Sequence, residues 1–330
     1  MIEQSSACVQ HVTNLSLVRW QLMKRVIVMI LAFAISSAAR AQTLELSLAA
    51  GSQPFSVNLA LQNFTLSEAP SITLEAAVSN QRVQLGAQVA LEFAGIGQAV
   101  VYSRFAVAYT GGLRYEGGAK GAIGPVSLEV AGAVWNADPT EFNVGAAYAQ
   151  QPQTLTSGGI DLGLQGAYRL TRTLVLIAGV KYGSSQSRFT ARLENRDGDW
   201  VYGGGTLLAW QSNGATLLLT GAAKYSPDDA PYSLQLQTSF GINQPSGFGW
   251  GGANIAFSYT LEELGLVSAY LNYEIWRLDV LPFRTGVNLE FNLGPGALIV
   301  QGYGGADLNW SFGGGGRIAY RLDLGSLLNP

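Results

Sequence analysis

A period of two dominates residues 159–182. In residues 160–170 the even positions are apolar, aromatic or glycine, and the odd positions are small, amide or charged. Thr171 and Arg172 make a short turn, and residues 174–182 return with their even positions again more apolar. Because successive side chains of a strand point to opposite faces, the pattern predicts two antiparallel strands. The side chains of the polar face are small and mostly neutral. This indicates that one side of the sheet faces lipid and the other a water-filled lumen.

Charge is scarce in this chain of 330 residues. Hydrophobic residues make up 48% and charged residues 12%, whereas an ordinary soluble domain has about 25% charged residues. No apolar run approaches the roughly 18–20 residues of a membrane-spanning helix. Since the bilayer admits only helices or closed sheets, the sequence predicts an all-β fold, an antiparallel transmembrane barrel of about 16–20 strands with short turns.

The N-terminus has the features of an export signal. Basic Lys24 and Arg25 precede an apolar stretch over residues 26–35, and small residues at 39 and 41 match a cleavage pattern before Gln42. We therefore expect residues 1–41 to be a signal peptide with residues 23–41 as its core. Residues 1–22 are interpreted as an upstream-start artefact or an extension of the basic region. The alternative to an export signal is a short buried helix. The predicted barrel domain is 42–330.

Removing this segment changes the inventory of reactive groups. It contains the single cysteine (Cys8), the single histidine (His11) and all three methionines. It also holds four of the 19 basic residues and one of the 22 acidic ones, which leaves 15 basic and 21 acidic residues. A disulfide framework and a thiolate or imidazole metal site are therefore excluded. A mildly acidic chain with three lysines is also a poor nucleic-acid binder, so we predict no such partner.

Alternation of the same kind runs along the remainder of the chain, in one domain without a linker or a repeat of fixed length. A glycine turn at Gly111 and Gly112 separates two of the expected strands, and the one longer connection is expected at residues 150–158. The expected strands are 43–50, 55–61, 72–78, 83–93, 101–109, 113–119, 126–134, 142–148, 160–170, 174–182, 188–194, 200–211, 215–225, 232–242, 253–259, 267–275, 283–293, 296–304, 307–312 and 317–324.

The spacing of aromatic residues independently indicates strands that span a membrane. Trp200 and Trp210 share a face and lie ten residues apart, roughly 33 Å along a strand. At a tilt of about 40° this corresponds to a height near 25 Å, the separation of the two aromatic girdles of a membrane barrel. Tyr182, Tyr225 and Trp250 also lie near strand ends and are predicted girdle residues. The alternative is the ordinary aromatic core of a soluble sandwich or β-solenoid.

With these features the mature chain resembles the outer-membrane β-barrel proteins, and general porins in particular, over residues 43–324. The resemblance implies outer-membrane lipid and the barrel assembly machinery as partners. Porins are often trimers, so a homo-oligomer of this chain is also possible under the resemblance. Such barrels typically end on an aromatic residue, whereas this chain continues past the alternating residues 318–324 to Pro330.

The mature sequence offers few residue arrangements that could support catalysis. Without histidine or cysteine in the mature chain, Ser–His and Cys–His arrangements are excluded, and only a Ser–Lys pair through one of three lysines or a pair of carboxylates stays open. Acidic pairs at 228–229 and 262–263 are interpreted as calcium ligands at a rim or as solvated loop tips. The glycine runs 203–205 and 313–316 lack a phosphate-loop lysine and predict turns, or places where strands bend or pack closely. We expect no enzyme and no cofactor.

A pore is the preferred interpretation. Barrels of 16–18 strands leave an aqueous passage, and no connection is long enough to form a large plug. Charges on the polar face would line the passage, with a basic set early and acidic residues on the late strands; alternatively they pair across strands. The chain is thus expected to pass small hydrophilic solutes by diffusion, and the alternatives are a structural or partner-binding barrel and a channel for apolar substrates. The pore-lining candidates are Arg169, Lys181, Arg188, Arg192, Glu274, Arg284, Glu290, Arg317 and Arg321.

Overall fold

The computed structural model describes residues 43–51, 55–68, 70–93, 97–136, 157–212, 214–243, 247–277 and 281–325. The expected signal peptide and the expected strand at 142–148 lie outside these ranges. Within them, no helix is long and apolar enough to cross a membrane.

The described residues form eighteen β-strands and one 3₁₀ turn, η2 (Glu262–Leu264). The strands are β1 (Thr43–Gly51), β2 (Ser56–Glu68), β3 (Ser71–Ser79), β4 (Arg82–Phe93), β5 (Gly97–Ala108), β6 (Leu113–Ile123), β7 (Val126–Trp135), β8 (Gly159–Arg169), β9 (Leu174–Gly183), β10 (Ser187–Asp197), β11 (Trp200–Gln211), β12 (Gly214–Tyr225), β13 (Tyr232–Asn243), β14 (Gly247–Thr260), β15 (Gly265–Glu274), β16 (Phe283–Leu293), β17 (Gly296–Ala306) and β18 (Phe312–Asp323).

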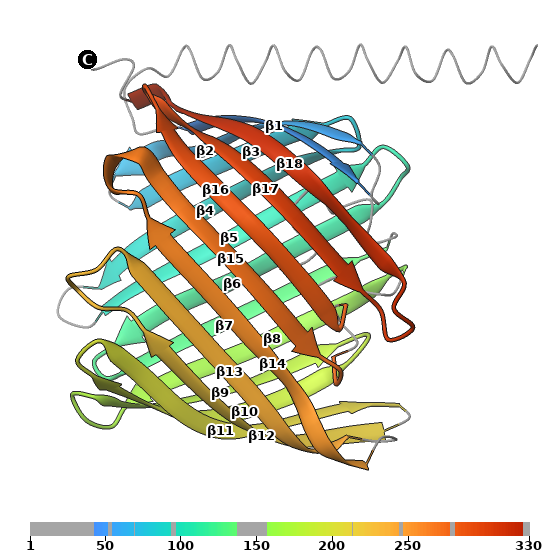
Figure 1. The fold of residues 1–330 in the computed structure, drawn as a ribbon. Coiled ribbons are helices and arrows are strands. Elements are labelled where there is room, and N and C mark those ends of the chain that lie inside the picture. The colour runs from blue at the N-terminus through green and yellow to red at the C-terminus, as the bar shows by residue number, and fades with distance from the viewer. Residues whose placement is uncertain are drawn as a thin grey trace, which may run out of the picture.

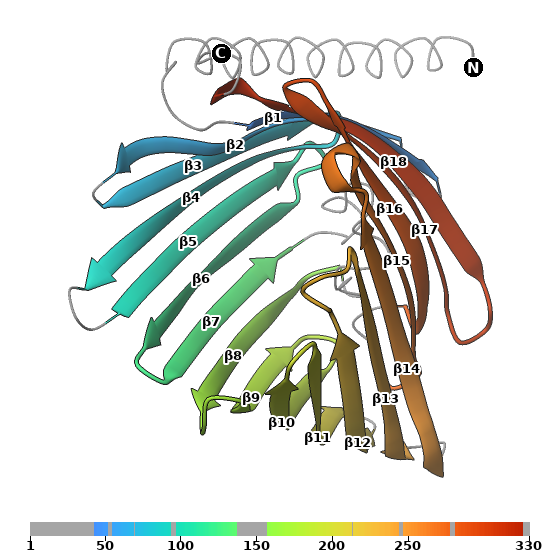
Figure 2. The ribbon, with the colours of Figure 1, turned by 60° about the vertical axis from the view of Figure 1, so that its left-hand side comes forward.

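Each strand pairs antiparallel with its neighbours in sequence, and the sheet closes on itself. The closing ladder joins β1 to β18 in continuous register, from Thr43 opposite Asp323 to Gly51 opposite Gly315. Figures 1 and 2 show the blue first strands and the red last strands side by side at this junction. The predicted antiparallel barrel of 16–20 strands is therefore confirmed as a closed barrel of 18.

The two ends of the barrel differ. The short-turn end holds the start of β1, the end of β18 and tight connections such as residues 124–125 and 294–295. At the opposite, long-loop end, β7 ends and β8 begins, and residues 136–158 join them in the sequence; β15 ends and β16 begins at the same end, joined by residues 275–282. β7 pairs directly with β8, so these two strands are neighbours in the sheet. The expected strand at 142–148 lies between them in the sequence and outside the described residues.

The expected strand at 307–312 is wrong. Asp307 begins a turn instead, because its carboxylate accepts hydrogen bonds from the backbone N–H groups of Asn309 (2.8 Å) and Ser311 (2.9 Å). An Asp side chain that satisfies following backbone donors in this way competes with the strand ladder. Only Phe312, the last residue of the expected segment, belongs to a strand, β18.

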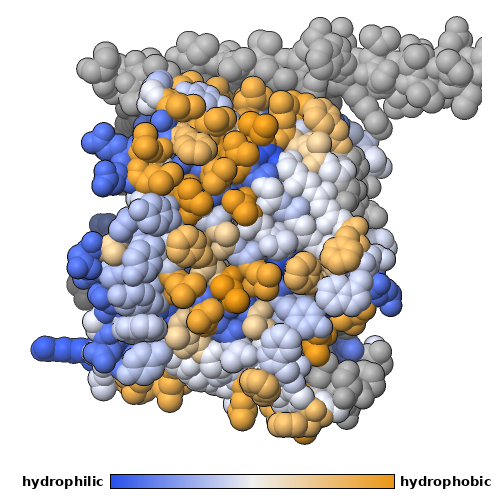
Figure 3. All heavy atoms as spheres, in the orientation of Figure 1, coloured by the Kyte–Doolittle hydropathy of each residue, from blue (hydrophilic) through white to orange (hydrophobic). Residues whose placement is uncertain are grey.

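Side chains alternate between an apolar outer face and a polar inner face. On β1 the outward Leu46 and Leu48 are 51% and 46% exposed, whereas the inward Glu45 and Ser47 are 4% and 2% exposed. Figure 3 shows apolar and weakly polar residues over the strands at the front, with hydrophilic residues gathered mainly at the left edge. The sheet is therefore inverted relative to a soluble sandwich, with its apolar side turned to the surroundings.

The two glycine runs lie inside strands and do not form turns. Residues 203–205 are in the middle of β11, and residues 313–316 are in β18. A Cβ atom on Gly203 would lie 2.1 Å from the carbonyl oxygen of Leu193, and one on Gly205 2.2 Å from that of Ala191. The turn interpretation is wrong, and the interpretation of close strand packing is confirmed for β10 and β11.

We predict that Gly205→Ala destabilises the barrel by about 2 kcal/mol, because the new Cβ must displace the backbone of β10. Gly221→Ala is the matched control, since a Cβ there meets no atom within 4 Å. Urea unfolding in lipid vesicles measures both variants. Equal stabilities of the two variants would contradict the close approach of β10 and β11.

Candidate pore

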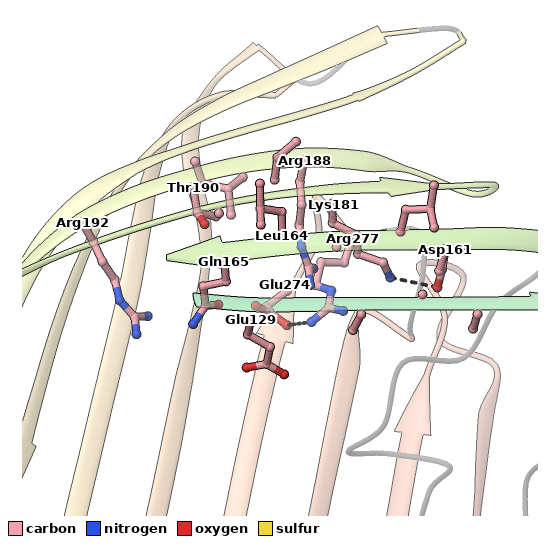
Figure 4. Close-up of a pocket in the computed structure, with 18 of the residues that line it drawn as sticks. Glu129, Asp161, Leu164, Gln165, Lys181, Arg188, Thr190, Arg192, Glu274 and Arg277 are labelled. Atoms are coloured by element: carbon pink, nitrogen blue, oxygen red, sulfur yellow. Dashed lines mark hydrogen bonds and ion pairs between the residues drawn. The ribbon is translucent and has the colours of Figure 1, made fainter. Parts of the chain in front are cut away.

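The inner face encloses a cavity of about 830 Å³. One wall comes from β7–β10 and carries Glu129, Gln165 and Arg188, and the opposite wall comes from β13–β16 and carries Asn254 and Glu274. Figure 4 shows Arg188, Lys181 and Gln165 pointing into the same space as Arg277 and Glu274. The lining is thus a mixture of both charges, amides and small residues, which suits water and polar solutes.

Strands β9 and β10 position three of the predicted residues. The ammonium of Lys181 on β9 lies 3.1 Å from the carboxylate of Asp161 on β8, because the register sets Gly163 opposite Lys181 and Asp161 on the adjoining diagonal. Arg192 on β10 lies 3.0 Å from Glu194 on the same strand. Two arginines of β10, Arg188 and Arg192, line the cavity.

Glu274 and Arg284 form a buried ion pair on the opposite wall. The carboxylate of Glu274 accepts a hydrogen bond from the guanidinium of Arg284, and Arg277 contacts the same oxygen at 3.5 Å. The side chains of Arg284 and Glu274 are 3% and 9% exposed. A charge this deeply buried needs a partner of opposite sign, so the pair is a structural part of the wall.

The remaining late-strand candidates also pair. Glu290 lies 3.5 Å from Arg321, and Glu45 contacts both Arg317 and, at 3.4 Å, Arg321. Since Glu274 and Glu290 each face arginine, the late strands do not form the acidic arc that the sequence suggested. Charges there pair across neighbouring strands, as the alternative interpretation expected.

A second network follows the inner face of β3–β7. Arg104 bonds to Glu75 and lies 3.3 Å from Glu116, which in turn lies 2.6 Å from Arg114. The guanidinium of Arg114 sits 5.3 Å from the ring of Trp135. Alternating charges of this kind keep the wall hydrated while cancelling much of its net charge.

Other charges of the inner face stand apart from these networks, among them Arg169 and Glu129. Arg169 occupies the short-turn end of β8, and Glu129 lines the cavity from β7. Within the described part of the chain neither has an ion pair within 4.0 Å. Glu129 therefore presents to the cavity a carboxylate that takes no part in these networks.

The predicted girdle residues fall near the two ends of the outer face. Trp200 and Tyr225 lie at the short-turn end with ring centroids 4.7 Å apart. Tyr182, Trp210 and Trp250 lie toward the long-loop end and are 58%, 38% and 46% exposed. Their contact with a membrane interface stays a prediction.

Trp276 and Gln186 are the site residues that sequence reasoning missed. Both lie in connections at the long-loop end, where no periodicity marks them. A signal was nevertheless present in the unbroken run Leu217–Leu219, because alternation points Leu218 into a polar lumen. An apolar residue on that face requires a cover, and Trp276 supplies it.

The acidic pairs at 228–229 and 262–263 lie in connections between strands at the short-turn end. Across the described ranges, no group of three His, Cys, Asp or Glu residues is arranged to hold a metal ion.

A closed antiparallel sheet with an apolar outside and a charged inside defines a porin-like outer-membrane β-barrel. No family model matches the sequence. No curated protein matches it either.

Among solved structures, a triple mutant of the Rhodopseudomonas blastica porin is similar at 11% identity, with 86% of this chain and 99% of that chain covered and a TM-score of 0.45. Another mutant of this porin is similar at 10% identity, with the same coverage and a TM-score of 0.46. At such scores the assignment rests on the geometry of the barrel itself.

We predict that Glu274→Gln destabilises the barrel by about 2 kcal/mol, because the buried guanidinium of Arg284 loses this carboxylate. Glu194→Gln is the control, since its partner Arg192 is 49% exposed and an exposed pair contributes less than about 1 kcal/mol. Urea unfolding of both variants in vesicles gives the comparison. A larger loss for Glu194→Gln would show that the Glu274 pair is not a structural part of the wall.

Proposed function

We propose that this protein is a channel for the passive diffusion of small hydrophilic solutes across the outer membrane. The observation that carries the proposal is the cavity of about 830 Å³, lined from opposite walls by charged and amide side chains. A closed barrel of 18 strands has the circumference to hold such a passage. Without water inside, these ionised groups would carry a large desolvation cost.

Export and orientation belong to the same proposal. Residues 1–41 would direct the chain across the inner membrane, and the barrel assembly machinery would insert it into lipid. In barrels of this class short turns face the periplasm and longer loops face outward. The connections 136–158 and 275–282 would then meet the outside first.

A planar lipid bilayer tests the channel. The full chain is expressed with its own N-terminus, extracted from the membrane in detergent and checked for a heat-modifiable band on a gel. Discrete ohmic steps are the expected result. A folded and inserted barrel without steps would contradict the channel and favour a structural or partner-binding barrel.

We predict that Glu129→Lys shifts the ratio of cation to anion permeability about twofold toward anions, because it reverses a charge exposed in the passage. Asp228→Asn, in the connection between β12 and β13, is the control and should leave the ratio unchanged. The reversal potential in a salt gradient measures both. An unchanged ratio in Glu129→Lys would place the conducting path away from this wall.

A further inference from the structure

Two leucines interrupt the polar inner face at the long-loop end. Leu207 on β11 and Leu218 on β12 point inward, yet they are only 6% and 0% exposed. They form a buried cluster with Ala209 and Trp276. Trp276 belongs to the connection after β15, so this side chain passes the inner faces of β13 and β14 to reach β12 and β11.

The intervening strands provide room for the indole. Their inner residues near Trp276 include Ser239 and Gly252, and the space left between Trp276 and the wall is only about 10 Å³. Gly251 lies where the register of β13 and β14 shifts, and a Cβ there would come within 2.8 Å of Leu218. Small residues and a bulge thus form a seat that fits one large aromatic side chain.

A hydrogen bond also joins the connection after β15 to the connection between β9 and β10. The side-chain nitrogen of Gln186, between β9 and β10, donates to the main-chain carbonyl of Trp276 at 2.7 Å. Gln186 is itself 6% exposed. A buried hydrogen bond between residues 90 positions apart holds the connection against the wall on the far side of β11.

The free side of this segment faces the cavity. Arg277 lines it and lies 5.7 Å from the ring of Trp276, and at the base Glu274 joins Arg277 and Arg284. Residues 275–277 therefore cross the inner face from β15 toward β10. They exclude the space beneath them from the passage.

We propose that Trp276, seated on β11 and β12 and fastened by Gln186, sets the size limit of the pore. This inference rests on the proposed channel function. It makes Trp276 the residue that discriminates among hydrophilic solutes by their diameter, because the bulk of the indole lies inside the lumen.

The test compares three variants with the wild-type chain in planar bilayers. Trp276→Ala should raise single-channel conductance by about 1.5-fold and admit larger polyethylene glycols, because the passage widens at this level. Trp276→Phe should stay near wild type. Trp210→Ala is the matched control, since Trp210 lies on the outer face of β11, next to Ala209 of the cluster that contains Trp276.

The outcomes separate the two levels of the proposal. A wild-type chain without conductance would overturn the channel function and this inference with it. A conducting wild type whose Trp276→Ala variant matches Trp210→Ala, or conducts less than wild type, would overturn only the size limit. Heat modification on a gel confirms that each variant is folded.

A chemical probe gives a second measurement that leaves Trp276 intact. The only cysteine lies at position 8, within the expected signal peptide, so an introduced thiol is unique in the mature chain. A bulky thiol reagent should reduce conductance through Arg277→Cys and leave Leu208→Cys, on the outer face of β11, unaffected. No effect at position 277 would remove this segment from the conducting path.

Discussion

The structure depends on one requirement, that every backbone amide facing lipid finds a partner inside the sheet. An open sheet would leave two edges of unpaired N–H and C=O groups in hydrocarbon, where each costs several kcal/mol. The ladder between β1 and β18 removes both edges. Arg317 and Glu45 form an ion pair across the same junction on its inner side.

Closure turns the two faces of each strand into two different environments. Residues of one parity face lipid and can be apolar without aggregation, while residues of the other parity face water in a confined space. Charges on the inner side are therefore close to one another whatever their position in the chain, and most of them pair. Glu75, Arg104 and Glu116 on one wall and Glu274 and Arg284 on the other illustrate this. The passage is consequently polar but nearly balanced, with Glu129 as an exposed exception.

Much of the fold could be predicted from the sequence, because a period of two determines both the strand and its faces. Leu46 and Glu45 are assigned to opposite sides by alternation alone. Features that depend on other strands could not be obtained in this way. The pairing of Glu274 with Arg284 follows from the register of β15 and β16. The turn at Asp307 comes from a side chain that competes with the ladder, and the close approach at Gly205 comes from the path of β10. The position of Trp276 depends on its contact with β12, three strands away from β15. In the sequence, only the inward-facing Leu218 indicated that a covering side chain was needed.

The bond between Gln186 and Trp276 also bears on the order in which the barrel is built. Ladders between neighbouring strands need only short loops to close, and they can form hairpin by hairpin as the chain is delivered. The Gln186 bond spans 90 positions and the Arg317–Glu45 bond spans 272. We therefore expect the narrow part of the lumen to be assembled once β15 has been added, before the last strands reach the first. The contact between Gln186 and Trp276 would then form before β18 pairs with β1 and closes the barrel.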